Sequence, residues 1–171
     1  MASPERGSSQ CQTAGSPNWL AALRAYLVVS AVGHLAWETA QLPFYTIWST
    51  ATRGALAFAV AHCTGGDILI ALTALVASLA TAGASTWPAH RFASVSALTL
   101  GFGIGYAVFS EWWNVAVRGT WAYAASMPTL PWIGTGVSPL LQWAVVPTLA
   151  LLASRSQAAH RNWIPDQRRM S

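Results

Sequence analysis

One apolar stretch of the sequence places an imidazole and a carboxyl group four residues apart. His34 and Glu38 lie within residues 30–44, and positions i and i+4 share one face of a helix. Ser30 lies one turn earlier and Gln41 nearly one turn later, so the polar groups form a stripe. An imidazole paired with a carboxyl group in a water-poor pocket can hold or relay a proton at neutral pH. The stretch therefore predicts proton-transfer chemistry.

The composition indicates that these groups lie in a membrane. Of the 171 residues, 54% are hydrophobic and only 8% are charged, whereas soluble domains average about 25% charged residues. A polar group in lipid is costly and must face protein or water. We therefore expect an all-α, polytopic membrane protein whose polar stripe faces the inside of a helix bundle.

Four stretches are long and apolar enough to span a membrane, since a span needs roughly 20 such residues. They cover about 19–44, 67–84, 92–113 and 137–153, within a transmembrane domain of residues 19–154. Residues 1–18 are expected to be disordered, and residues 155–171 form a basic tail.

The glycines of the sequence predict two local features. Gly65 and Gly66 weaken a helix, so residues 55–66 are expected to form a short interfacial or re-entrant piece. Asp67 would then cap the second span; the alternative is one bent helix. Gly101 and Gly105 predict a face for close helix packing.

The arginines set the expected orientation. Four spans put both termini on one side, and that side holds seven of the nine: Arg6, Arg24, Arg91, Arg155, Arg161, Arg168 and Arg169. The positive-inside rule then places both termini in the cytoplasm. We expect a plasma membrane of bacterial inner-membrane type, with membrane lipids as the surroundings and no nucleic-acid partner. The sequence predicts no oligomeric state.

This orientation collects the acidic residues of the spans in the outer half of the bundle. The candidate proton-transfer residues are His34, Glu38, Asp67 and Glu111. The candidate ligand-binding residues are Trp37, Gln41, Asn114, Gln142 and Trp143. The plainer alternatives are that Asp67 caps a helix, that Glu111 lies at the wet interface, and that the tryptophans only pack.

Metal binding is an alternative use of the same region. The possible zinc or copper ligands are His34, Glu38, His62, Cys63 and Asp67, whose side chains suit those ions. Their spacing matches no recognised metal motif, so the first expectation is a protein without a cofactor.

Several short motifs resemble the EXPERA group, which includes emopamil-binding protein (a sterol isomerase) and the sigma-2 receptor. His34-Leu35 followed by Glu38 is similar to the group's His-Leu-x-x-Glu, and Gly66-Asp67 to its Gly-Asp. Further similarities lie in Tyr106 with Glu111, in Gln142-Trp143 with Pro147, and in Glu38 with Gln41-Leu42-Pro43-Phe44. Gln142 replaces the group's Asn, and the second acid of its second helix is missing here. A separate family of small bacterial-type membrane proteins is the alternative.

The resemblance implies isomerisation of an apolar, isoprenoid-like ligand. Glu38 and His34 would donate a proton to a double bond, Asp67 or Glu111 would accept one, and Trp143 would stabilise the cation. Two other hypotheses stand beside it: metal binding or transport, and a non-catalytic membrane subunit whose polar groups fix helix packing.

Overall fold

The computed structural model describes residues 19–160 as a helical bundle. Its elements are α1 (Trp19–Gln41), η1 (Leu42–Phe44), α2 (Ile47–Thr50), α3 (Arg53–Ala82), α4 (Phe92–Glu111), η2 (Trp112–Val117) and α5 (Val137–His160). Four helices are long and apolar enough to cross a membrane, which confirms the predicted all-α, four-span architecture. The expected disorder of 1–18 and the tail beyond 160 lie outside the described residues.

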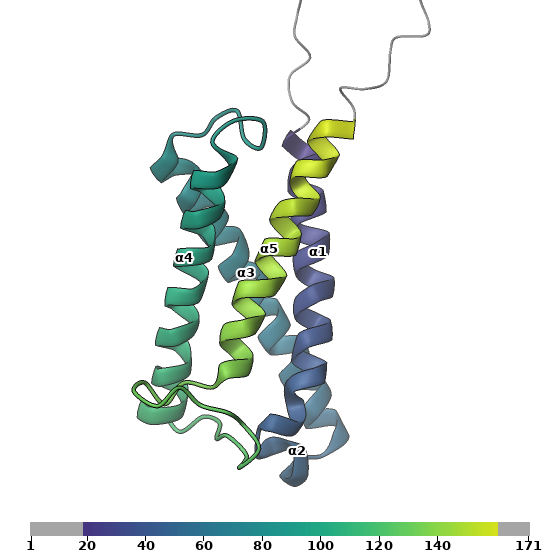
Figure 1. Ribbon diagram of the computed structural model, residues 1–171. Coiled ribbons are helices and arrows are strands. Elements are labelled where there is room, and N and C mark those ends of the chain that lie inside the picture. Colours follow the sequence, from purple (N-terminus) through teal and green to yellow (C-terminus); the bar gives the residue numbers. More distant parts are fainter. Residues whose placement is uncertain (1–18, 161–171) are drawn as a thin grey trace, which may run out of the picture.

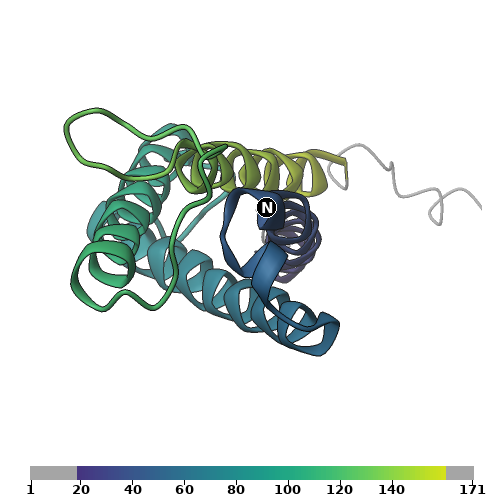
Figure 2. The same ribbon diagram turned by 90° about the horizontal axis from the view of Figure 1, so that it is seen from below.

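The long helices run up and down between two different ends (Figure 1). The loop end carries η1, α2 and the segment 118–136, and the turn end carries the segment 83–91. Figure 2 views the bundle from the loop end, where residues 118–136 cross from α4 to α5. The crossing segment is tied down by backbone hydrogen bonds from Thr46 N to Ala122 O (3.0 Å) and from Ala124 N to Phe44 O (2.8 Å).

Two of the helices bury a residue at nearly every fourth position. The buried residues of α1 include Ala22, Tyr26, Ser30 and His34. Those of α4 are Val95, Thr99, Gly103, Ala107 and Glu111. A spacing of four aligns side chains along one ridge of a helix, so each helix turns a single narrow stripe to its neighbours, and the polar groups of α1 fall on that stripe.

The outward faces of the helices are apolar. Large side chains such as Val32, Phe58, Leu69 and Leu149 are between 54% and 71% exposed. Soluble monomers rarely leave extended apolar surfaces uncovered, and hydrocarbon chains of a bilayer would cover these.

The expected break before Asp67 is wrong, because α3 is one helix of 30 residues that runs through Gly65 and Gly66. The Thr52 side chain accepts a hydrogen bond from Ala55 N and caps it. Each glycine costs a helix about 1 kcal/mol relative to alanine, whereas breaking the helix in lipid would leave backbone groups without partners. Asp67 is therefore an interior residue of α3 and not a cap.

Three further boundaries or contacts differ from prediction. The helix from Phe92 changes at Trp112 into the π-helix η2, and α5 continues past residue 153 to His160, because polar residues end an apolar span without ending a helix. A Cβ on Gly101 or Gly105 would meet nothing within 4 Å, whereas a Cβ on Gly103 would lie 2.5 Å from Trp143. The close-packing position within the described chain is therefore Gly103, and the predicted Gly101/Gly105 face packs against no other part of it.

Candidate functional site

Six polar side chains from three helices meet in the half of the bundle nearer the loop end. This polar cluster consists of His34, Glu38 and Gln41 of α1, Asp67 of α3, and Ser138 and Gln142 of α5. His34 is 0% exposed and Gln142 1%. Buried polar groups are stable only when they are hydrogen-bonded, so the pattern of donors and acceptors decides what the cluster can do.

Close approach of α1 to α5 brings these groups within hydrogen-bond distance. Gly33 of α1 faces Val146 of α5, and a Cβ on Gly33 would lie 2.7 Å from a Val146 methyl group. The neighbouring His34 is thereby held against α5. On the other side, the absence of a side chain at Gly103 leaves room for Trp143, whose ring centroid lies 5.1 Å from that of His34.

The indole of Trp37 sets the direction of the hydrogen-bond chain. Its Nε1–H, which can only donate, donates to Ser138 Oγ at 3.1 Å. The Ser138 hydroxyl in turn donates to Gln41 Oε1 at 2.9 Å. The Gln41 amide nitrogen therefore faces the cluster and donates to Glu38 Oε1 at 2.8 Å and to Gln142 Oε1 at 3.2 Å.

The amide nitrogen of Gln142 lies at the centre of the cluster. It is 2.9 Å from His34 Nδ1, 3.0 Å from Glu38 Oε1 and 3.0 Å from Asp67 Oδ2. An amide has two hydrogens to donate, so it cannot serve three acceptors. One of the three groups must carry a proton of its own if all are to be satisfied, and the geometry therefore favours a proton held inside the cluster.

His34 and Asp67 can share that proton. His34 Nδ1 lies 3.3 Å from Asp67 Oδ2, so a hydrogen on Nδ1 can be donated to the carboxylate while Gln142 donates to Glu38 and Asp67. The other ring nitrogen, Nε2, is buried and has no hydrogen-bond partner. A carboxylate that holds Nδ1–H fixes the tautomer and leaves Nε2 as the atom able to exchange a proton.

Glu111 lies in a second polar group at the loop end. Its carboxylate accepts a hydrogen bond from the Tyr123 hydroxyl, which itself accepts one from Gly136 N at 2.9 Å. Burial raises the pKa of Tyr123 above its ordinary value, and the hydrogen bond to Glu111 raises it further. Burial likewise raises the pKa of Tyr45, whose ring lies 5.6 Å from that of Tyr123. Because the partner of Glu111 is Tyr123, Glu111 lies apart from the hydrogen bonds of the polar cluster.

The remaining candidate residues lie in different surroundings. Asn114 donates to Ser110 of its own helical stretch, at 2.8 Å to the carbonyl oxygen and 3.3 Å to the hydroxyl oxygen. His62 is exposed and stacks on Phe58, with ring centroids 5.7 Å apart. Cys63 is a half-buried free thiol. Within residues 19–157, no three His, Cys, Asp or Glu side chains are grouped so as to hold a metal ion.

Two members of these networks were not among the predicted site residues. Ser138 lies one helical turn before Gln142, so the four-residue spacing on α5 was a usable signal for it. Tyr123 lies in the segment 118–136, whose course depends on its contacts with residues 44–46, and no local pattern indicates its partner.

Comparison of the chain with protein-family models, with curated proteins and with solved structures finds no match.

Proposed function

We propose that this membrane protein binds an apolar, isoprenoid-like ligand beside His34 and isomerises it by acid–base chemistry. The observation that carries the proposal is the buried imidazole whose Nδ1 faces a carboxylate while its Nε2 has no partner. An imidazole held in this way is suited to general acid–base catalysis. The ligand class follows from the resemblance to the EXPERA group.

The proposed reaction moves one double bond. When Nε2 as well as Nδ1 carries a proton, His34 donates the hydrogen on Nε2 to one alkene carbon, which leaves a carbocation on its neighbour. The carboxylate of Glu38 removes a proton from the adjacent carbon, and its electron pair forms the new double bond. Passing a proton from Glu38 back to His34 restores the starting state.

Other members of the polar cluster have supporting roles in this scheme. Asp67 is a positioning residue, because it acts through Nδ1 of His34. The Trp143 ring, next to the imidazole, supplies a face that attracts a cation. Because His34 is fully buried, ligand entry requires side chains beside Nε2 to move. We place the site in the outer half of the membrane, with both termini cytoplasmic.

Deuterium uptake by two isoprenoid probes, farnesol and squalene, tests the proposal. The purified protein is reconstituted into liposomes with each probe in D₂O, and carbon-bound deuterium is measured by mass spectrometry. Protonation of a double bond from exchangeable groups must place deuterium on carbon. The matched variants are His34→Gln and His62→Gln, since His62 is exposed on the outward face of α3.

We expect labelling by the native protein and by His62→Gln, and at least about a 100-fold loss in His34→Gln, as is typical when a general acid or base is removed. Equal labelling in His34→Gln would refute the assignment of His34. No labelling above protein-free liposomes would refute isomerisation of these probes.

A structural role is the second candidate, and one observation favours it. The polar cluster joins α1, α3 and α5 through buried hydrogen bonds, and interhelical hydrogen bonds between membrane helices stabilise bundles by about 0.6–2 kcal/mol each. In that case His34→Gln lowers the stability of the bundle, and native protein shows no labelling.

A further inference from the structure

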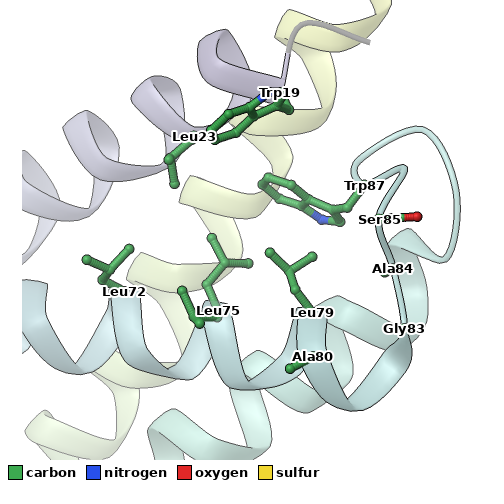
Figure 3. Close-up of a pocket in the computed structure, with 11 residues that line it drawn as sticks. Trp19, Leu23, Leu72, Leu75, Leu79, Ala80, Gly83, Ala84, Ser85 and Trp87 are labelled. Carbon is green, nitrogen blue, oxygen red and sulfur yellow. The ribbon is translucent and has the colours of Figure 1, made fainter. Parts of the chain in front are cut away.

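A separate groove opens at the turn end of the bundle. Its volume is about 540 Å³, within the range of about 300–1,000 Å³ found for small-molecule sites. It lies between the start of α1, the last turns of α3 and the segment 83–91 (Figure 3). Its main lining side chains are Trp19, Leu23, Leu72, Leu75, Leu79 and Trp87.

The groove has the surface of a site for a hydrocarbon chain. Leucine and tryptophan side chains make its walls, and the small residues Ala80, Gly83 and Ala84 line it at and just after the end of α3. Trp19 is 56% exposed at the rim, at the end of a span where tryptophans commonly meet the headgroup region of a bilayer. One end of the groove therefore reaches headgroup depth while the remainder faces the acyl chains.

Trp87 supplies a specific polar contact. Its side chain is 5% exposed, and its Nε1 has no hydrogen-bond partner. In Figure 3 this nitrogen lies on the edge of the indole nearer Leu79, and surrounding atoms cover it. An indole N–H can only donate, and a buried donor without an acceptor is unfavourable. The expected occupant therefore carries a hydrogen-bond acceptor near the end of its apolar chain.

Positive charge surrounds the same end. Arg24 follows the groove residue Leu23, and Arg91 donates to the carbonyl oxygen of Ala82, next to Gly83. Arg155 lies over the Phe92 ring at 5.0 Å. Among residues 19–157 the acids Glu38, Asp67 and Glu111 all lie toward the loop end, and none forms a salt bridge to these arginines. The charge at the turn end is thus complementary to an anionic headgroup.

We propose that this groove binds an acyl chain of an anionic phospholipid. When the side chains that cover Trp87 Nε1 move aside, an ester carbonyl accepts its hydrogen bond, and the phosphate lies beside Arg24 and Arg91. The site is distinct from the polar cluster, and it does not depend on the proposed isomerisation.

Native mass spectrometry of the full chain in detergent tests the proposal. The probes are phosphatidylglycerol and phosphatidylcholine with identical acyl chains. Trp87→Phe removes the N–H donor, Ala80→Trp fills the groove from an exposed position, and Arg24→Gln removes a charge. Arg53→Gln is the matched control, because Arg53 is exposed at the start of α3, at the loop end. Circular dichroism and gel filtration establish that each variant is folded.

We expect one phosphatidylglycerol per chain, bound at least about fivefold more tightly than phosphatidylcholine, since each basic residue near a lipid surface contributes about 1 kcal/mol. Trp87→Phe should weaken its binding about fivefold, the effect of one hydrogen bond. Ala80→Trp should weaken binding of both lipids, Arg24→Gln should weaken only phosphatidylglycerol, and Arg53→Gln should change neither.

Three results would overturn the proposal. Equal affinity for the two lipids would exclude an anionic headgroup as the determinant. Unchanged lipid binding in folded Ala80→Trp and Trp87→Phe would place the lipid elsewhere. A lipid-free dimer that Ala80→Trp converts to a monomer would show that a second copy of the chain occupies the groove.

Discussion

Nδ1 of His34 lies 3.3 Å from Oδ2 of Asp67, although the two residues belong to different helices. The Gln142 amide nitrogen, 2.9 Å from the same Nδ1, donates to two carboxylates and has no third hydrogen to offer. A hydrogen on Nδ1 that is donated to Asp67 leaves both Gln142 hydrogens for the two carboxylates, whereas a bare Nδ1 would take one of them. The proposed arrangement is the first of these. This is the less common state for a neutral histidine in water, so it can be tested directly.

The first prediction concerns this tautomer. In protein labelled with ¹⁵N-histidine and reconstituted in nanodiscs, His34 should show a protonated Nδ1, because Asp67 accepts its hydrogen. The His34→Gln variant identifies its signals among those of the four histidines. His62, which is exposed and stacks on Phe58, provides the internal comparison. An unprotonated Nδ1 at His34 would contradict the proposed arrangement of hydrogens.

The second prediction concerns Gln142. Gln142→Leu removes the donor that serves Glu38 and Asp67 and the acceptor used by Gln41. Three interhelical hydrogen bonds are lost, and each stabilises a membrane bundle by about 0.6–2 kcal/mol, so the free energy of unfolding should fall by about 2 kcal/mol or more. Unfolding by SDS in mixed micelles measures the change.

The control for Gln142 lies on the same helix. Gln157 is exposed near the end of α5, so Gln157→Leu should change the unfolding free energy by less than about 0.5 kcal/mol. If the two variants unfold alike, the hydrogen bonds of Gln142 do not stabilise the bundle.

The third prediction compares two glycines of α4. A Cβ on Gly103 would lie 2.5 Å from the Trp143 ring. Overpacking of this kind costs about 1–3 kcal/mol, so Gly103→Ala should lower the free energy of unfolding by that amount. A Cβ on Gly105 would meet nothing within 4 Å, so Gly105→Ala should be neutral or stabilise the helix by up to about 1 kcal/mol. SDS titration distinguishes the two variants, and equal stabilities would show that Trp143 moves freely away from α4.

The sequence predicts the helical parts of the candidate site better than its contacts. The four-residue spacing of His34 and Glu38 correctly places both on the inward side of α1, and apolar length correctly indicates four spans. Gly103 could not be chosen over Gly101 or Gly105, because a helix that is apolar all round carries no periodic signal for its inward face. Only the partner residue Trp143 identifies the position.

The sequence favours a break in α3 over its alternative of one helix for a related reason. Local propensity disfavours helix at Gly65 and Gly66, but in lipid the backbone has no water to replace lost hydrogen bonds. The unbroken helix α3 keeps Asp67 away from a helix end, and the Asp67 carboxylate contacts His34 and Gln142. The hydrogen bond from Tyr123 to Glu111 depends on how the segment 118–136 folds back over residues 44–46. That fold is set by tertiary contacts, which leave no local pattern in the sequence.

The fourth prediction concerns alkaline pH and rests on Tyr45 and Tyr123. Burial raises the pKa of both hydroxyl groups above the ordinary value of 10.0. Because the folded state favours the neutral phenol, the stabilisation is complete below pH 10 and is lost as the pH rises above it, where the unfolded chain ionises first. The free energy of unfolding should therefore fall between pH 10 and 11. The double variant Tyr45→Phe with Tyr123→Phe should flatten this dependence, whereas Tyr106→Phe, at an exposed tyrosine, should preserve it. An unchanged slope in the double variant would show that other groups control alkaline unfolding.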